Sequence, residues 1–135
     1  MTLVDAGPLV AILDPRDGEH NRCLNVLPTL SSPLVTSWPA FAEAMYLVGT
    51  NGGWQAQEML WRLALRHDLR VESIDRDGMK RASELMHKYR DLPMDLADAT
   101  LVVIAEAQKT SRIFTLDKDF RLYRLHGRKP FEIIP

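Results

Sequence analysis

The chain has 135 residues, which is the length of one domain, and we expect a single domain over residues 1–135. Its 46% hydrophobic and 26% charged residues are typical of a globular protein, and its net charge of −1 excludes a uniformly basic nucleic-acid-binding chain. No apolar run approaches the ~20 residues of a membrane span, and the N-terminal residues lack the basic region of a signal peptide. The single cysteine, Cys23, allows no disulfide within the chain. We therefore expect a cytoplasmic protein with no membrane partner.

Short apolar segments alternate with helical patterns along the chain. In chain order, the pattern predicts a strand at 2–5, helices at 9–13 and 19–27, a strand at 34–36, helices at 41–48 and 54–66, a strand at 69–74, a helix that Asp75 caps and that reaches residue 89, a helix at 96–108, a strand at 112–115, a helical turn at 120–125 and an edge strand at 131–134. The glycine-rich stretch 49–53 predicts a turn between two helices. Strands separated by helices indicate crossover connections, and hence an α/β fold with a parallel sheet.

Acidic residues occupy the positions where such a sheet binds ligands, which are the carboxyl ends of its strands. Asp5 ends the first strand, and Asp117 follows the strand at 112–115. Glu43 and Asp98 lie early in helices and have apolar neighbours without a basic residue beside them. Because a buried carboxylate is costly without a partner, these acids indicate a cluster around a cation. Oxygen ligands alone suit Mg²⁺ or Mn²⁺ better than zinc.

Each acid also has a simpler interpretation, and Asp98 could merely satisfy backbone amides at the start of its helix. Asp5 and Asp117 could serve the turns that follow their strands, as could Asp119. Glu43 could face solvent on an amphipathic helix, and the position of Asp95 before residues 96–108 favours a helix N-cap over a ligand.

Positive charge is concentrated near the C-terminus. Residues 109–129 contain seven lysines and arginines against two aspartates. Lys118, Arg121 and Arg124 follow Asp117 closely, so they are candidates for contacts with the phosphate groups of a nucleic acid. The alternative is that these charges only solvate the surface.

Four segments together resemble the PIN-domain ribonucleases, and among them the VapC toxins of toxin–antitoxin modules. The segments are Leu3–Asp5, Pro39–Glu43, Met94–Ala99 and Thr115–Phe120, in this order along essentially the whole chain. The resemblance implies a PIN-like three-layer sandwich with a central parallel five-stranded sheet flanked by helices. It also implies a homodimer, an antitoxin partner, and an endoribonuclease that depends on Mg²⁺ or Mn²⁺ and cleaves single-stranded or structured RNA.

The resemblance also assigns residues. It places the four catalytic and metal-binding acids at Asp5, Glu43, Asp98 and Asp117, and it makes Thr115 a supporting hydroxyl. Asp95 and Asp119 are further candidates for a supporting role. One departure is Ala6, at a position where the family often has Thr or Ser.

Two other functions compete with this hypothesis. A PIN-like module could have lost catalysis and retained only RNA or protein binding. A phosphatase with an aspartyl nucleophile would prefer a second aspartate where this chain has Gly7. His20 and Cys23 have no second pair that would complete a zinc site. Trp54 and Trp61, at heptad spacing, are expected in the core.

Overall fold

The computed structural model describes all residues from 1 to 135. Its strands are β1 (Thr2–Val4), β2 (Leu34–Ser37), β3 (Arg70–Glu72), β4 (Arg112–Phe114), β5 (Arg124–Leu125), β6 (Lys129–Pro130) and β7 (Glu132–Ile134). Its helices are α1 (Ala6–Leu13), α2 (His20–Val26), α3 (Trp38–Leu65), α4 (Arg76–Lys88) and α5 (Leu96–Gln108), with 3-10 turns η1 (Leu27–Thr29) and η2 (Lys118–Arg121). None of the helices has the length and apolar character that crossing a bilayer requires.

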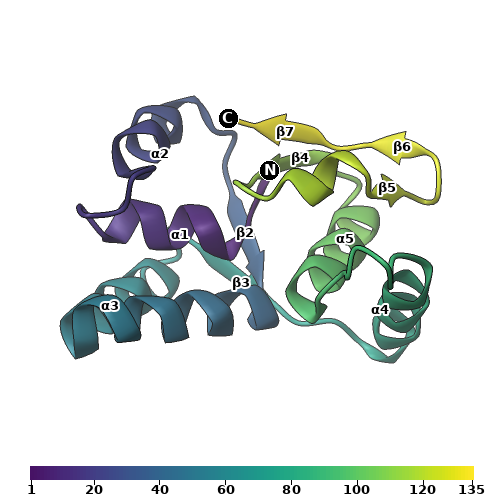
Figure 1. The fold of residues 1–135 in the computed structure, drawn as a ribbon, viewed down its shortest axis with the longest axis horizontal. Coiled ribbons are helices and arrows are strands. Elements are labelled where there is room, and N and C mark those ends of the chain that lie inside the picture. Colours follow the sequence, from purple (N-terminus) through teal and green to yellow (C-terminus); the bar gives the residue numbers. More distant parts are fainter.

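The predicted parallel sheet is confirmed. Five strands lie in the order β3-β2-β1-β4-β7, and every neighbouring pair is parallel. Strand β1 is central, and β7 is the predicted edge strand (Figure 1). Because the strands are parallel, the residues that follow β1 and β4 leave the sheet at the same edge.

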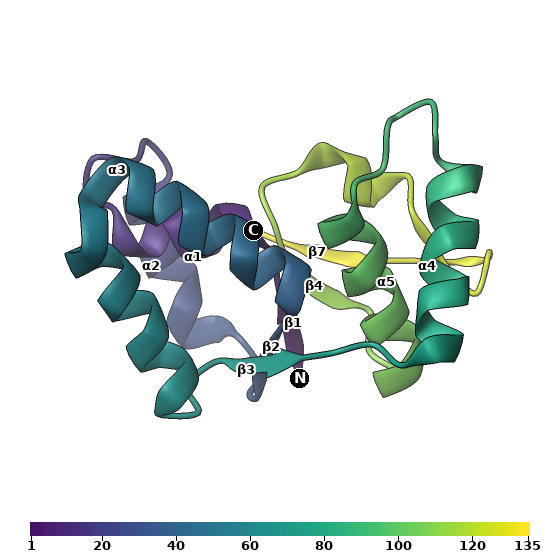
Figure 2. The ribbon, with the colours of Figure 1, turned by 90° about the horizontal axis from the view of Figure 1, so that it is seen from below.

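Helices cover both faces of the sheet, so the predicted three-layer sandwich is confirmed. Alternate residues of each strand point to opposite faces: Leu3 and Ile113 pack with α4 and α5, whereas Val4 and Phe114 pack with α1, α2 and α3. Figure 2 shows the two helical layers on either side of the strands. The central strand β1 is buried on both sides, which explains why Leu3 and Val4 are both apolar, whereas the edge strands β3 and β7 carry exposed charged residues.

The turn predicted at residues 49–53 is wrong in its extent. Helix α3 continues through residue 52, and only Gly53 leaves helical geometry, with φ of 66° and ψ of −159°. The side chain of Gln57 packs against Gly49 and donates a hydrogen bond to the carbonyl of Met45 at 3.3 Å, which ties the two halves together. The core position predicted for Trp54, next to this break, is also wrong, because its side chain is 63% exposed.

The helical turn predicted at 120–125 is only partly correct. The 3-10 turn η2 ends at Arg121, and β5 then pairs antiparallel with β6 in a hairpin that the sequence did not predict. His126 and Gly127 make the hairpin turn with positive φ of 50° and 73°. The apolar residues at 120, 123 and 125 resemble a helical stripe, yet they reach the core from a turn and a strand.

Candidate active site

Three aspartates converge because each has a defined place at the end of an element. Asp5 follows β1 and caps α1, where its Oδ1 accepts a hydrogen bond from the amide of Ala6 at 2.7 Å. Asp117 follows β4 and caps η2, and its Oδ1 accepts from the amide of Asp119 at 2.9 Å. Asp98 lies in the first turn of α5, and one of its carboxylate oxygens lies close to those of Asp5 and Asp117. The sheet and α5 therefore bring together residues far apart in the sequence.

The convergence is tight enough for one ion. One carboxylate oxygen each from Asp5, Asp98 and Asp117 lies within 4.8 Å of the others. Asp5 and Asp98 are buried, with 7% and 5% of their surface exposed, and no lysine or arginine forms an ion pair with any of the three. A divalent cation with oxygen ligands fits this set, because it would supply the positive charge that the buried carboxylates lack.

Glu43 reaches the same place from α3, on the rim. It lines a hollow of about 270 Å³ together with the three aspartates, Asp95 and Leu47. Its side chain is exposed, and it is not among the acids within 4.8 Å of one another. Glu43 is therefore suited to bind a water molecule in the hollow, or to contact an ion from the side that faces the solvent.

Hydroxyl groups hold the two buried carboxylates. Thr115 donates from Oγ1 to Oδ2 of Asp5 at 2.8 Å, and it also accepts from the amide of Asp117 at 3.0 Å. Tyr123 donates its phenol to Oδ2 of Asp98 at 2.8 Å. The sequence did not reveal Tyr123, because nothing in its own segment indicates a contact with Asp98.

Burial raises the pKa values of Asp5, Glu43 and Asp98. The pKa of Asp98 is raised to about 8, chiefly by desolvation, and the hydrogen bond from Tyr123 opposes that rise. Desolvation also raises the pKa of Asp5, against the bonds from Thr115 and Ala6. The pKa of Glu43 is raised as well, by desolvation and then by nearby carboxylates. The cluster is thus short of positive charge.

The remaining acids near the site, Asp95 and Asp119, take part in local backbone hydrogen bonds. Asp95 is the N-cap of α5, as predicted, since its Oδ1 accepts from the amide of Asp98 at 2.8 Å. Its exposed carboxylate also lines the acidic hollow. Asp119 contacts Asp117 through its backbone amide. At Ala6, where the family often has a hydroxyl, the backbone amide donates to Asp5 instead.

A second hollow, of about 200 Å³, adjoins the acidic one and shares Leu116 and Asp117 with it. Its basic residues are Arg22, Lys118 and Arg121. Lys118 and Arg121 form no ion pair, and the 3.4 Å contact between Arg22 and Glu19 is solvent-exposed. Arg22 was missed from the sequence, because α2 approaches this edge only in the folded chain.

Arg124, the third basic residue predicted to contact RNA, lies outside that hollow. Its guanidinium donates to the backbone carbonyls of Arg121 and Tyr123 at 2.7 and 2.9 Å. These bonds occupy one terminal nitrogen of the group, so Arg124 is less available to a ligand than Lys118 or Arg121.

The chain is similar to characterised proteins over its whole length. It is 28% identical to ribonuclease VapC26 of Mycobacterium tuberculosis over 134 residues, covering 98% of this chain and 99% of that protein. Its fold matches VapC20 of the same organism, a toxin that cleaves the sarcin-ricin loop, with a TM-score of 0.82, 18% identity, and coverage of 88% and 92% of the two chains. A toxin–antitoxin complex from Klebsiella pneumoniae matches with a TM-score of 0.67, 21% identity, and coverage of 89% and 90%.

The family model described as PIN domain matches residues 2–125, which include the three clustered aspartates, Glu43 and both hydroxyl donors. The match therefore spans the sheet and the acidic edge together, and the chain belongs to the PIN domain family.

Proposed function

We propose that this protein is a metal-dependent endoribonuclease that hydrolyses phosphodiester bonds in RNA, and that it is the toxin of a toxin–antitoxin pair in the cytoplasm. The observation that carries the proposal is the convergence of carboxylate oxygens from Asp5, Asp98 and Asp117 within 4.8 Å, without a cationic partner. Family membership and the similarity to ribonuclease VapC26 support the same activity. Residues 1–135 would act as one domain.

Mg²⁺ or Mn²⁺ is the proposed cofactor, and the donor set of carboxylates alone suits either. A bound divalent ion would polarise the phosphate and lower the pKa of water beside it. Asp5, Asp98 and Asp117 would hold the ion. Glu43, on the rim and with a raised pKa, would orient a water or accept its proton at the carboxylate.

The neighbouring basic hollow would receive the RNA backbone. Arg22, Lys118 and Arg121 face a space that shares Asp117 with the acidic hollow, so a strand bound there passes directly over the acids. Phosphate contacts of this kind position a strand without reading its sequence. These three residues would bind the phosphates, whereas the guanidinium of Arg124 would hold the backbone carbonyls of Arg121 and Tyr123.

Protein partners form the last part of the proposal. We expect a homodimer and an antitoxin, as the family resemblance implies. Large apolar side chains on α3 are exposed, with Trp38, Tyr46 and Trp54 at 47%, 72% and 63%. Exposed apolar groups of this size support a protein partner on that helix. Light scattering of the isolated protein, with and without its antitoxin, tests both associations.

Cleavage of mixed cellular RNA by the purified protein tests the activity. We expect discrete fragments with Mn²⁺ or Mg²⁺, none with EDTA, and none from Asp5→Asn. The matched control is Asp68→Asn, because it removes an exposed carboxylate from the loop before β3 and should leave cleavage intact. Intact RNA after incubation with folded, antitoxin-free protein would favour a non-catalytic binding module instead.

A further inference from the structure

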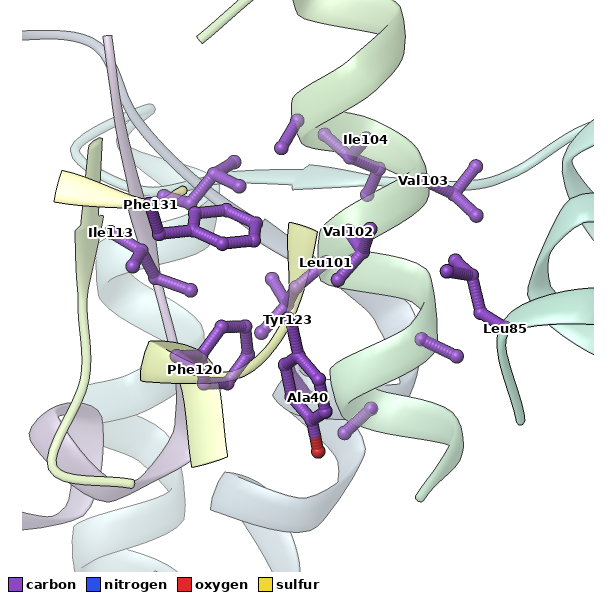
Figure 3. Close-up of a cluster of buried hydrophobic side chains, with 14 of the residues drawn as sticks. Ala40, Leu85, Leu101, Val102, Val103, Ile104, Ile113, Phe120, Tyr123 and Phe131 are labelled. Atoms are coloured by element: carbon purple, nitrogen blue, oxygen red, sulfur yellow. The ribbon is translucent and has the colours of Figure 1, made fainter. Parts of the chain in front are cut away.

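Tyr123 combines complete burial with a polar contact to the site. The side chain is 0% exposed, and Figure 3 shows its ring among apolar side chains such as Phe120 and Leu101, with the oxygen at the edge of that cluster. The oxygen donates to Oδ2 of Asp98 at 2.8 Å. A phenylalanine would fill the same apolar space, so the hydroxyl is explained by its contact with the acid.

Aromatic neighbours fix where that hydroxyl can lie. The ring of Tyr123 packs edge-to-face against Phe120 and Tyr89, with centroids 5.0 Å away in both cases and interplanar angles of 81° and 65°. A ring held on two sides cannot swing to follow a moving carboxylate. The carboxylate must instead align with the phenol.

We propose that Tyr123 is a positioning residue that locks the carboxylate of Asp98 for metal binding. This inference rests on the proposed function of the site. With Oδ2 held by Tyr123, rotation of the carboxylate is restrained, and Oδ1 makes no hydrogen bond within the protein. The same arrangement recurs at Asp5, whose Oδ2 is held by the hydroxyl of Thr115. Groups that hold metal ligands in this way commonly contribute ten- to a hundredfold to metal affinity or activity.

Titration of RNA-free protein with Mn²⁺, with free Mn²⁺ measured by electron paramagnetic resonance, tests the proposal. We expect Tyr123→Phe to bind Mn²⁺ about tenfold or more weakly than the wild type. In cleavage assays its requirement for Mn²⁺ should rise, whereas turnover at saturating Mn²⁺ should largely recover. A purely structural hydroxyl would not separate these two quantities.

Tyr89→Phe is the matched control. It removes a hydroxyl from the same aromatic group, and that hydroxyl accepts from the amide of Arg124 at 3.2 Å and touches no acid. We expect its Mn²⁺ affinity to equal that of the wild type. An equal loss in both variants would overturn the proposal in favour of general packing, and so would an unchanged affinity in Tyr123→Phe.

A second comparison separates an effect through Asp98 from a general loss of packing. If the phenol acts through Asp98, Tyr123→Phe added to Asp98→Asn should weaken Mn²⁺ binding no further than Asp98→Asn alone. A further tenfold loss in the double variant would overturn the proposal. Metal binding by the wild type without RNA cleavage would instead contradict the proposed function. The comparison of Mn²⁺ affinities would still show whether Tyr123 positions Asp98.

Discussion

The four acids of the site form two pairs with different surroundings. Asp5 and Asp98 are buried, and each accepts a hydrogen bond from a hydroxyl that follows β4 in the chain. Asp117 and Glu43 lie nearer to solvent, and neither accepts a bond from a hydroxyl. The charged form of the inner pair is unfavourable without fixed donors and a cation, whereas the outer pair can exchange protein contacts for water. The inner pair thus determines the geometry of the site.

The strongest test of this difference is Asp98→Asn, which should abolish cleavage and change the pH dependence of stability. In the folded protein the pKa of Asp98 is about 8, against an ordinary value of 3.8. The folded state therefore keeps a proton that the unfolded chain releases, so metal-free wild type should lose stability as pH rises from about 4 to 8.

Thermal unfolding in EDTA across that pH range measures the effect. Asp98→Asn should flatten the decline and unfold at a higher temperature than the wild type near pH 8. Asp68→Asn should keep the shape of the wild-type profile. A decline of the same steepness in Asp98→Asn would show that the buried carboxylate is not its source.

A smaller effect is expected at the hydroxyl that holds Asp5. Thr115→Val should weaken Mn²⁺ binding about tenfold, because Asp5 loses the donor to its Oδ2. The matched control is Thr36→Val, since Oγ1 of Thr36 is buried without a partner and its loss should leave binding unchanged and stability equal or higher. Mn²⁺ titration with thermal unfolding checks both. Equal Mn²⁺ affinities in the two variants would remove the distinction between inner and outer acids.

The smallest effects are expected in the basic hollow. Arg22→Gln, Lys118→Gln and Arg121→Gln should each reduce the dependence of log K on log salt by about 0.7, the value for one single-strand phosphate contact. Fluorescence anisotropy of labelled RNA, in an Asp5→Asn background that does not cut it, measures that slope. Arg128→Gln, on the exposed hairpin, is the matched control. Slopes that match the control would place the RNA elsewhere.

The sequence was sufficient to predict the parallel sheet, the meeting of two of its acids and the N-cap of α5. Apolar strands separated by helices predicted the parallel sheet, and Asp5 and Asp117, which follow β1 and β4, were expected to meet once those strands paired. The cap at Asp95 was likewise readable from its position before α5. These predictions needed only the order of the segments and the residues at their ends.

Side-chain contacts between segments far apart in the chain could not be predicted from the sequence. Tyr123 and Asp98 are joined across the core, and Arg22 reaches the site from α2, so neither has a signature in its own segment. The glycines of α3 misled for a related reason, because Gln57 bridges back to Met45 and sustains a helix that composition alone would end. Spacing also suggested a helix where the hairpin begins, since burial at every second or third position suits either structure.

The segment from Thr115 to Tyr123 supplies both hydroxyl donors, Asp117 and two cations of the basic hollow. Strand β4, which precedes it, fills the place in the sheet between β1 and β7. During translation, Asp5 and Glu43 therefore emerge long before the groups that complete their site. A domain generally folds as a unit. The acidic site of a nascent chain is therefore incomplete until the segment from Thr115 to Tyr123 has been synthesised, and the site and the last strands of the sheet form together.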